Sequence, residues 1–356
     1  MKFNKILLSI LFIFIFNKTL YSNDFVLKDL IGLNTPWGIS FIDENKIIIT
    51  EKNGSIKIFN IGENKIYPIK HNLKISNIGQ GGLLDILYKN KIVYVSYSEK
   101  LKNNKSSTSI AIAKYNNNFL EFKNIFRAEP AIQSGFHFGS RIVLKDNFLY
   151  ASIGERGKGD IAQDPSKHPG SIIRIHIDGT IPKDNPKFLE NKKWAKEIYQ
   201  IGVRNPQGMA LSPFDSNIYI SNHGAKGGDW FGEVTSGSNY GWPILGWGGT
   251  NYSGSKIGPK WKKGFKKAIH YWVPSIAISA IQIYNGKEFE KWNGKALIAS
   301  LKDQSLRMLD FKDINNIQES IVFSDKIGII RDLEIHPVNG KIFLLSQNQL
   351  WLMEKI

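Results

Sequence analysis

Hydrophobic and polar residues alternate along this chain in short runs, and the runs recur as pairs. A polar, turn-like cluster precedes an apolar run that ends near Ser or Thr, and a second apolar run lies shortly upstream. Strands alternate with a period of two and favour β-branched side chains, so each pair predicts two strands joined by a turn. The turn and its following run occur at 43–54, 88–99, 145–157, 214–224, 293–303 and 339–349.

A looser third apolar run follows in several units. The clearest examples are 55–60, 171–178, 305–311 and 349–356. Six such units predict an all-β fold, a six-bladed β-propeller. The last unit leaves no room for a fourth strand, so segment 24–30 is predicted to supply it and close the ring. Short helices are expected only in insertions such as 185–200.

The first residues differ in composition from the repeats. Lys2 and Lys5 precede an apolar run, Ile6–Phe16, and Ser22 offers a cleavage point. This pattern predicts a signal peptide over 1–22 and a propeller domain over 23–356. An uncleaved anchor is the alternative, but the run is short for a bilayer. We therefore expect a periplasmic or secreted protein with no stable membrane span, and the absence of cysteine excludes disulfides and a lipoprotein anchor.

The formal net charge is +16, and loss of the signal peptide would leave about +13. A basic balance of this size can indicate nucleic acid or an anionic surface as the partner. Here the lysines are scattered, and neither an arginine-rich arm nor zinc-finger spacing is present. We therefore expect no nucleic-acid partner.

Several motifs stand beside the innermost predicted strands of the repeats. Loops at one end of a propeller channel collect side chains from every blade, so these motifs are expected to converge. Three cations meeting there would require an anionic ligand, because their repulsion in a partly desolvated site is otherwise uncompensated. The candidate residues are Gln80, His137, Arg204, Asn205, Lys302 and Arg331.

In their order, these motifs resemble the soluble PQQ-dependent sugar dehydrogenases, a family that includes soluble glucose dehydrogenase and the aldose sugar dehydrogenases. The resemblance runs from about Thr35 to the C-terminus. It implies a six-bladed propeller and the oxidation of an aldose to its lactone by pyrroloquinoline quinone (PQQ), a flat tricarboxylate. The matching motifs are GQGGLLD (79–85), HFGSR (137–141), RNPQG (204–208), NYGWP (239–243) and the late Arg331–Asp332.

The resemblance also implies a role for each candidate residue. His137 matches the general base that takes the anomeric hydroxyl proton while hydride passes from sugar C1 to the quinone. Backbone carbonyls of Gly224 and Ala225 match ligands of a Ca²⁺ ion. The electrons would pass to a respiratory acceptor, a cytochrome or a quinone. The positions that match cofactor contacts are Arg204, Lys302 and Arg331 as cations, and Gln80 and Asn205 as polar groups.

The chain departs from the family pattern in places. Ile329 stands where relatives commonly carry a second arginine, which predicts weaker cofactor binding. Ala225 replaces a proline at the metal loop, and Phe136 replaces a polar residue beside the histidine. The Gly-, Lys- and aromatic-rich segment 245–272 is either a solvated loop or a wall at the rim of the site.

Other interpretations of these residues stay open at this point. His137 alone could be a buried structural histidine, and the motif set favours the base. A non-catalytic propeller that binds a protein or glycan is the alternative function, because propellers host unrelated activities. A Ca²⁺-dependent lactone or ester hydrolase is disfavoured, since the inner motifs contain no carboxylate cluster around a metal.

Overall fold

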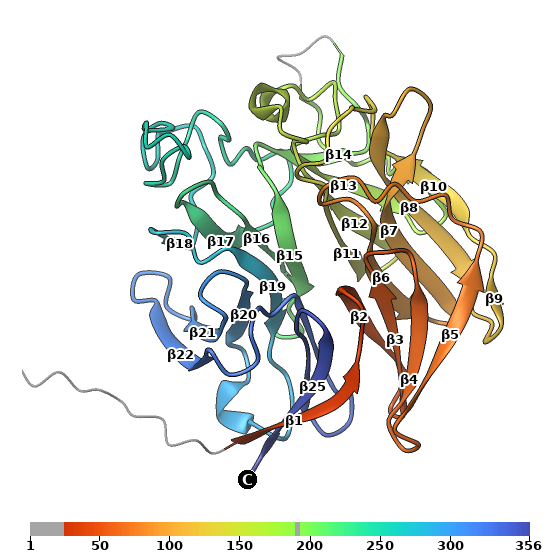
Figure 1. Ribbon diagram of the computed structural model, residues 1–356. Helices are drawn as coiled ribbons and strands as arrows, with labels where there is room; N and C mark the ends of the chain where they lie inside the picture. Colours follow the sequence, from red (N-terminus) through yellow and green to blue (C-terminus); the bar gives the residue numbers. More distant parts are fainter. Residues whose placement is uncertain (1–24, 189–192) are drawn as a thin grey trace, which may run out of the picture.

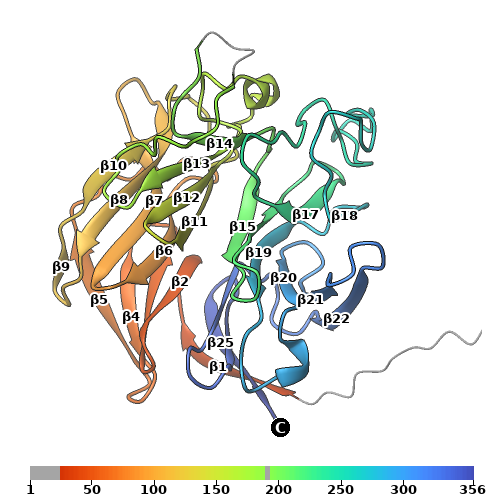
Figure 2. The ribbon, with the colours of Figure 1, turned by 180° about the vertical axis from the view of Figure 1, so that it is seen from behind.

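Six sheets surround a central channel in the computed structural model, which describes residues 25–188 and 193–356 (Figures 1 and 2). The prediction of an all-β six-bladed propeller is confirmed. The innermost strands β2, β6, β11, β15, β19 and β23 contact one another in turn around the ring. The signal peptide predicted over 1–22 lies outside the described residues, and within them no helix is long and apolar enough to cross a membrane.

The first three blades contain the following strands. Blade 1 has β2 (Pro36–Asp43), β3 (Lys46–Glu51), β4 (Ile56–Asn60) and β5 (Lys65–His71), with the short β9 (Phe119–Leu120) paired in parallel to β5. Blade 2 has β6 (Leu83–Lys89), β7 (Ile92–Lys100), β8 (Ser106–Lys114) and β10 (Lys123–Arg127). Blade 3 has β11 (Gly139–Lys145), β12 (Phe148–Ile153), β13 (Ser171–His176) and β14 (Ile198–Ile201).

The other three blades repeat this arrangement. Blade 4 has β15 (Pro206–Leu211), β16 (Ile218–Asn222), β17 (Asp229–Glu233) and β18 (His270–Trp272). Blade 5 has β19 (Ile278–Ile283), β20 (Ala296–Ser300), β21 (Ser305–Asp310) and β22 (Gln318–Ser324). Blade 6 has β23 (Asp332–Ile335), β24 (Ile342–Leu345), β25 (Gln349–Lys355) and β1 (Phe25–Gly32).

The two ends of the described chain close the ring in blade 6 (Figure 1). Strand β1 pairs antiparallel with β25, with Phe25 opposite Lys355 and Gly32 opposite Gln349. The prediction that the N-terminal segment supplies the missing strand is therefore confirmed for its described part. This pairing makes β1 the outermost strand of blade 6 and joins the N-terminal segment to the C-terminal strand in one sheet.

The helix expected in insertion 185–200 is wrong for the residues described there. Ile198 and Tyr199 belong to β14, and residues 185–188 and 193–197 lack regular structure. The Asn185 side chain donates hydrogen bonds to the carbonyls of Arg174 and Lys196, which fastens the insertion to its blade. The described helical turns are two short 3₁₀ segments, η1 (Gly159–Gln163) and η2 (Glu290–Trp292).

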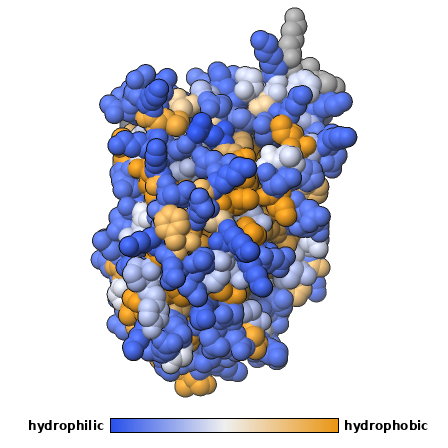
Figure 3. Space-filling view, turned by 90° about the vertical axis from the view of Figure 1, so that its right-hand side faces the viewer, coloured by the Kyte–Doolittle hydropathy of each residue, from blue (hydrophilic) through white to orange (hydrophobic). Residues whose placement is uncertain are grey.

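Adjacent blades pack through apolar side chains that alternate along the strands. Ile47 and Ile49 of β3, for example, are buried against Phe343 and Leu345 of β24. The opposite side chains of a strand pack against the other neighbouring blade, which is why blades show near-continuous apolar runs. One outer face of the propeller is largely hydrophilic, with hydrophobic groups gathered toward its middle (Figure 3).

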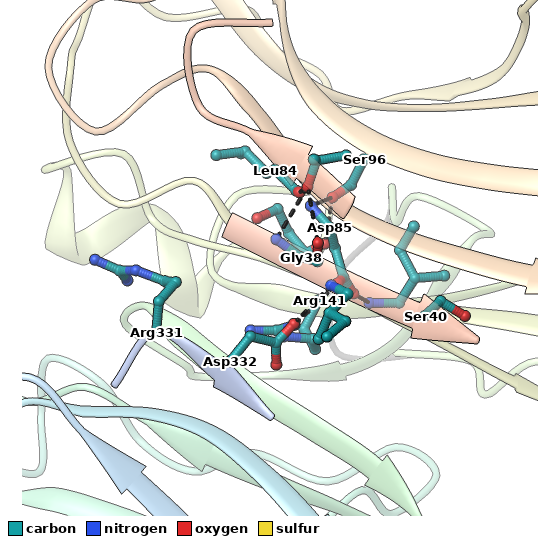
Figure 4. A network of polar contacts seen from close by, with 12 residues as sticks. Gly38, Ser40, Leu84, Asp85, Ser96, Arg141, Arg331 and Asp332 are labelled. Atoms are coloured by element: carbon teal, nitrogen blue, oxygen red, sulfur yellow. Dashed lines mark hydrogen bonds and ion pairs between the residues drawn. The ribbon is translucent and has the colours of Figure 1, made fainter. Parts of the chain in front are cut away.

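A buried ion-pair network ties the innermost strands together at the channel (Figure 4). Arg141 of β11 donates from Nη1 to Asp85 of β6 (2.9 Å) and to Asp332 of β23 (2.7 Å). Its Nε donates to the Gln207 carbonyl of β15 at 3.1 Å. One guanidinium thus joins four blades. Burial raises the pKa of Asp85 to about 6 despite the opposing effect of Arg141.

Arg141→Leu is expected to lower the free energy of unfolding by about 3–5 kcal/mol, because it leaves two buried carboxylates unpaired. Burial raises the pKa of both carboxyl groups, so protonation relieves the unpaired charge at low pH. The loss should therefore be smaller at pH 5 than at pH 8, measured by urea denaturation.

Arg127→Leu is the matched control for this prediction. Arg127 pairs with Glu99 on the outside of blade 2, with its side chain 43% exposed. Its removal should cost less than about 1 kcal/mol. Equal losses from the two substitutions would contradict a special role for the channel network.

Candidate active site

A cavity of about 260 Å³ lies at one end of the channel. Each blade contributes the residues that enter its first strand or leave its second, because antiparallel pairing brings both to the same end of the ring. Five of the predicted site residues line this cavity together: Gln80, His137, Arg204, Asn205 and Arg331.

His137 is held in an unusual backbone conformation just before β11. Its φ of +48° lies in the left-handed region, which is uncommon for residues other than glycine. The His137 amide donates to Gln80 Oε1 at 2.8 Å, and its carbonyl accepts from the Arg156 amide at 3.2 Å. Gly154 packs against that carbonyl so closely that a Cβ would lie 2.1 Å from it. Strain of this kind is retained where the surroundings fix it, commonly at functional sites.

The imidazole of His137 is oriented by a buried carboxylate. Its Nδ1 is hydrogen-bonded to Glu155 Oε1, and the Glu155 side chain is 2% exposed. A carboxylate at Nδ1 selects the tautomer that leaves a lone pair on Nε2, and Nε2 has no protein partner in the described part of the chain. Burial lowers the pKa of His137, and Arg204 adds to this, while Glu155 opposes it. The ring is therefore neutral near pH 7.

Three cations line the cavity without a carboxylate partner. For Lys52, Arg204 and Arg331, no Asp or Glu oxygen lies within 4.0 Å among residues 25–188 and 193–356. Burial lowers the pKa of each, that of Arg331 to about 10. Uncompensated positive charge in a partly desolvated cavity fits an anionic ligand with several acidic groups.

The two amide residues of the site differ in their surroundings. Asn205 is buried, and its Oδ1 accepts from the Gly139 amide at 3.0 Å, which fixes the backbone beside His137. Gln80 is exposed and acts through its hydrogen bond to His137. Gln80 and Asn205 therefore both line the cavity, and both also fix the backbone at or beside His137.

Lys302 is not brought into the cavity. Its side chain is exposed, and the preceding residue, Leu301, contributes to the lining instead. The predicted cofactor contact of Lys302 stays a prediction, because the lining of the cavity does not include it.

The predicted Ca²⁺ ligands lie beside the cavity. The Gly224 carbonyl accepts from Arg204 Nη1 at 2.5 Å, and the His223 carbonyl accepts from the same atom at 3.2 Å. Ala225 is buried next to them. Carbonyl oxygens suit a hard cation, but here a guanidinium occupies the position between them. The Gly224 carbonyl is thus engaged by Arg204, and the calcium ligands Gly224 and Ala225 stay a prediction.

Sequence reasoning missed several residues of the site. Glu155 lies two residues after β12, the second strand of its blade, and Lys52 directly follows β3, the second strand of blade 1. The sequence signal that could have identified both residues is their position just after the second strand of a blade. Trp37 and Tyr252 also line the cavity, and Tyr252 brings segment 245–272 to the site as a rim wall while remaining 72% exposed.

Residues 33–351 match the glucose / sorbosone dehydrogenase family. This chain belongs to that family.

Two comparisons with E. coli proteins illustrate the similarity. The chain is 32% identical over 335 residues to aldose sugar dehydrogenase YliI of Escherichia coli, covering 90% of this chain and 89% of the relative. The crystal structure of the E. coli soluble aldose sugar dehydrogenase in the apo-form superposes with a TM-score of 0.88 at 29% identity, covering 93% of this chain and all of that one.

The chain is also similar to a protein named as a quinoprotein and to a PQQ-bound structure. Quinoprotein glucose dehydrogenase B of Acinetobacter calcoaceticus is 27% identical over 318 residues, covering 77% of this chain and 63% of the relative. The PQQ-bound aldose sugar dehydrogenase of Streptomyces coelicolor has the same fold, with a TM-score of 0.73 at 20% identity over 94% of this chain and 99% of that one. One relative is therefore named as a quinoprotein, and one protein of the same fold is PQQ-bound.

Glu155→Gln is expected to lower the pKa of His137 further, because the charge and hydrogen bond of Glu155 raise it. Histidine ring signals followed by NMR against pH would measure the shift, with His137→Ala identifying the signal. Glu197→Gln, which acts on His168 instead, is the matched control and should leave His137 unchanged. An unchanged His137 titration in Glu155→Gln would contradict the pairing.

Proposed function

We propose that this protein oxidises aldose sugars to lactones with PQQ as its cofactor. The observation that carries the proposal is that one cavity brings together three cations without a carboxylate partner among the described residues and a histidine oriented by Glu155. Membership of the glucose / sorbosone dehydrogenase family supports it. The sugar enters as a small-molecule substrate from the open end of the channel.

The donor set of the cavity fits PQQ. Arg204 and Arg331 present planar forks of N–H groups, which match carboxylate and quinone oxygens in pairs. Arg331 is held by Gln207 Oε1 at 2.9 Å, and its guanidinium lies 6.0 Å from the ring centre of Trp37. When bound, PQQ supplies the two-electron acceptor that no amino-acid side chain provides.

His137 is the general base of the proposed reaction. Its Nε2 accepts the anomeric hydroxyl proton while hydride leaves C1 of the same sugar, so that the carbon–oxygen bond becomes the lactone carbonyl. Glu155 is a positioning residue: it holds Nδ1–H and stabilises the imidazolium that forms. Phe136, 59% exposed beside His137, and Tyr252 present aromatic faces on which a sugar ring can stack.

Whether the activity requires Ca²⁺ is to be tested by experiment. The Gly224 carbonyl is bound by Arg204, so no step of the reaction is assigned to a metal here. Transfer of electrons to a respiratory acceptor and export through a signal peptide over 1–22 belong to the same proposal.

His137→Ala is expected to lower kcat by roughly 10²–10⁴-fold, the usual contribution of a general base, while PQQ still binds. Dye reduction by the mature protein reconstituted with PQQ, with and without CaCl₂, over a panel of aldoses measures the effect. His176→Ala, at the outer end of β13, is the control and should keep full activity. Failure of the wild-type protein to bind PQQ, or full activity in His137→Ala, would refute the proposal.

The reaction should need His137 unprotonated, so kcat should fall as pH drops through its pKa and stay level above it. Burial and Arg204 lower that pKa from its ordinary value of 6.5. The acid limb should therefore lie below pH 6.5, and in Glu155→Gln it should move to still lower pH with a reduced plateau. A limb above pH 7 in the wild-type profile would exclude His137 as the titrating base.

A further inference from the structure

Lys52 enters the cavity from blade 1, directly after β3. It lines the same cavity as His137 and Arg331, and its Nζ donates to the Gly79 carbonyl at 2.6 Å. The next residue, Gln80, holds the His137 amide. The ammonium group is therefore fixed to the same short segment that positions the histidine.

The backbone and stem of Lys52 are also fixed. Its amide donates to the Thr35 carbonyl at 2.9 Å, and its carbonyl accepts from the Leu83 amide at 3.2 Å. Gly82 lies against the stem, where a Cβ would come within 2.6 Å of Lys52 Cγ. A lysine that is already ordered loses little further conformational freedom when it binds a ligand.

No protein group neutralises Lys52 among the described residues. Its neighbour in sequence, Glu51, is taken by Lys57 Nζ (2.6 Å) and by the Asn34 amide (2.6 Å). Burial lowers the pKa of Lys52, and the positive charge of Arg331 lowers it further. By contrast, ion pairs with carboxylates are formed by Lys28, Lys57, Lys167, Lys266, Lys295 and Lys341.

We propose that Lys52 is a cofactor-binding residue, which holds an acidic group of the anionic cofactor in the cavity that it lines together with Arg204 and Arg331. It thereby supplies the third charge of the site, the charge that Lys302 was expected to supply. This inference rests on the proposed function, since it takes PQQ as the ligand. The apolar Ile329 contributes no charge, which leaves Lys52 and Arg331 as neighbouring cations at this part of the cavity.

The test is a titration of the metal-free and cofactor-free protein with PQQ, read by quenching of tryptophan fluorescence, because Trp37 lines the cavity. Lys52→Met should raise the Kd about 10- to 100-fold, the usual effect of losing a charged hydrogen bond. Lys52→Arg should stay within a few-fold of the wild type. Lys70→Met, an exposed lysine of β5 in the same blade, is the charge-matched control and should bind as the wild type does.

A second measurement needs no variant and so does not depend on folding. Bound PQQ should protect Lys52 of the wild-type protein from acetylation, measured by mass spectrometry, and leave Lys302 and Lys70 as reactive as before.

Each outcome separates this inference from the proposed function. If the wild type binds PQQ but Lys52→Met binds equally well, or Lys52 gains no protection, Lys52 is not a cofactor contact and the proposed function stands. If Lys302→Met weakens binding and Lys52→Met does not, the sequence-based assignment of Lys302 is right and this one is wrong. No binding by the wild type would overturn both proposals.

Discussion

The structure depends on one buried guanidinium at the centre of the ring. Arg141 binds Asp85 and Asp332 by ion pairs and the Gln207 carbonyl by a hydrogen bond, so four innermost strands meet at one side chain. Apolar packing between blades is repetitive and tolerates a small sliding of one blade against the next. Arg141 must contact Asp85 and Asp332 at the same time, so the blades cannot slide without leaving buried charges unpaired.

The ion-pair network is linked to the candidate active site by residues that adjoin it in sequence or take part in both. Arg331 precedes Asp332, and Figure 4 shows its side chain extending away from the ion pairs. Gln207 gives its carbonyl to Arg141 and its side-chain oxygen to Arg331. The centre of the fold and the cationic cavity therefore share the two segments at the starts of β15 and β23, so the geometry of one limits that of the other.

The fold could be predicted from the sequence because each blade carries its own local pattern of turn and strands. Ring closure by the N-terminal segment could also be predicted, because the last unit lacks a fourth strand of its own. The site was predictable where residues sit in motifs, as His137 and Arg204 do. Glu155, Lys52 and the exposed placement of Lys302 were not, because side-chain direction after a strand depends on bulges and on packing against other blades. The insertion 185–200 was misjudged because its charged residues resemble a helix while Ile198 and Tyr199 complete a sheet.

The pairing of β1 with β25 has a consequence for how the molecule is made. Phe25 and Lys355 lie at opposite ends of the described chain. Strand β1 therefore has no partner until β25 has been synthesised. Such a long loop closes slowly and late. The ring therefore cannot close until β25 has been made, so the last blade is completed only when synthesis of the chain is nearly finished.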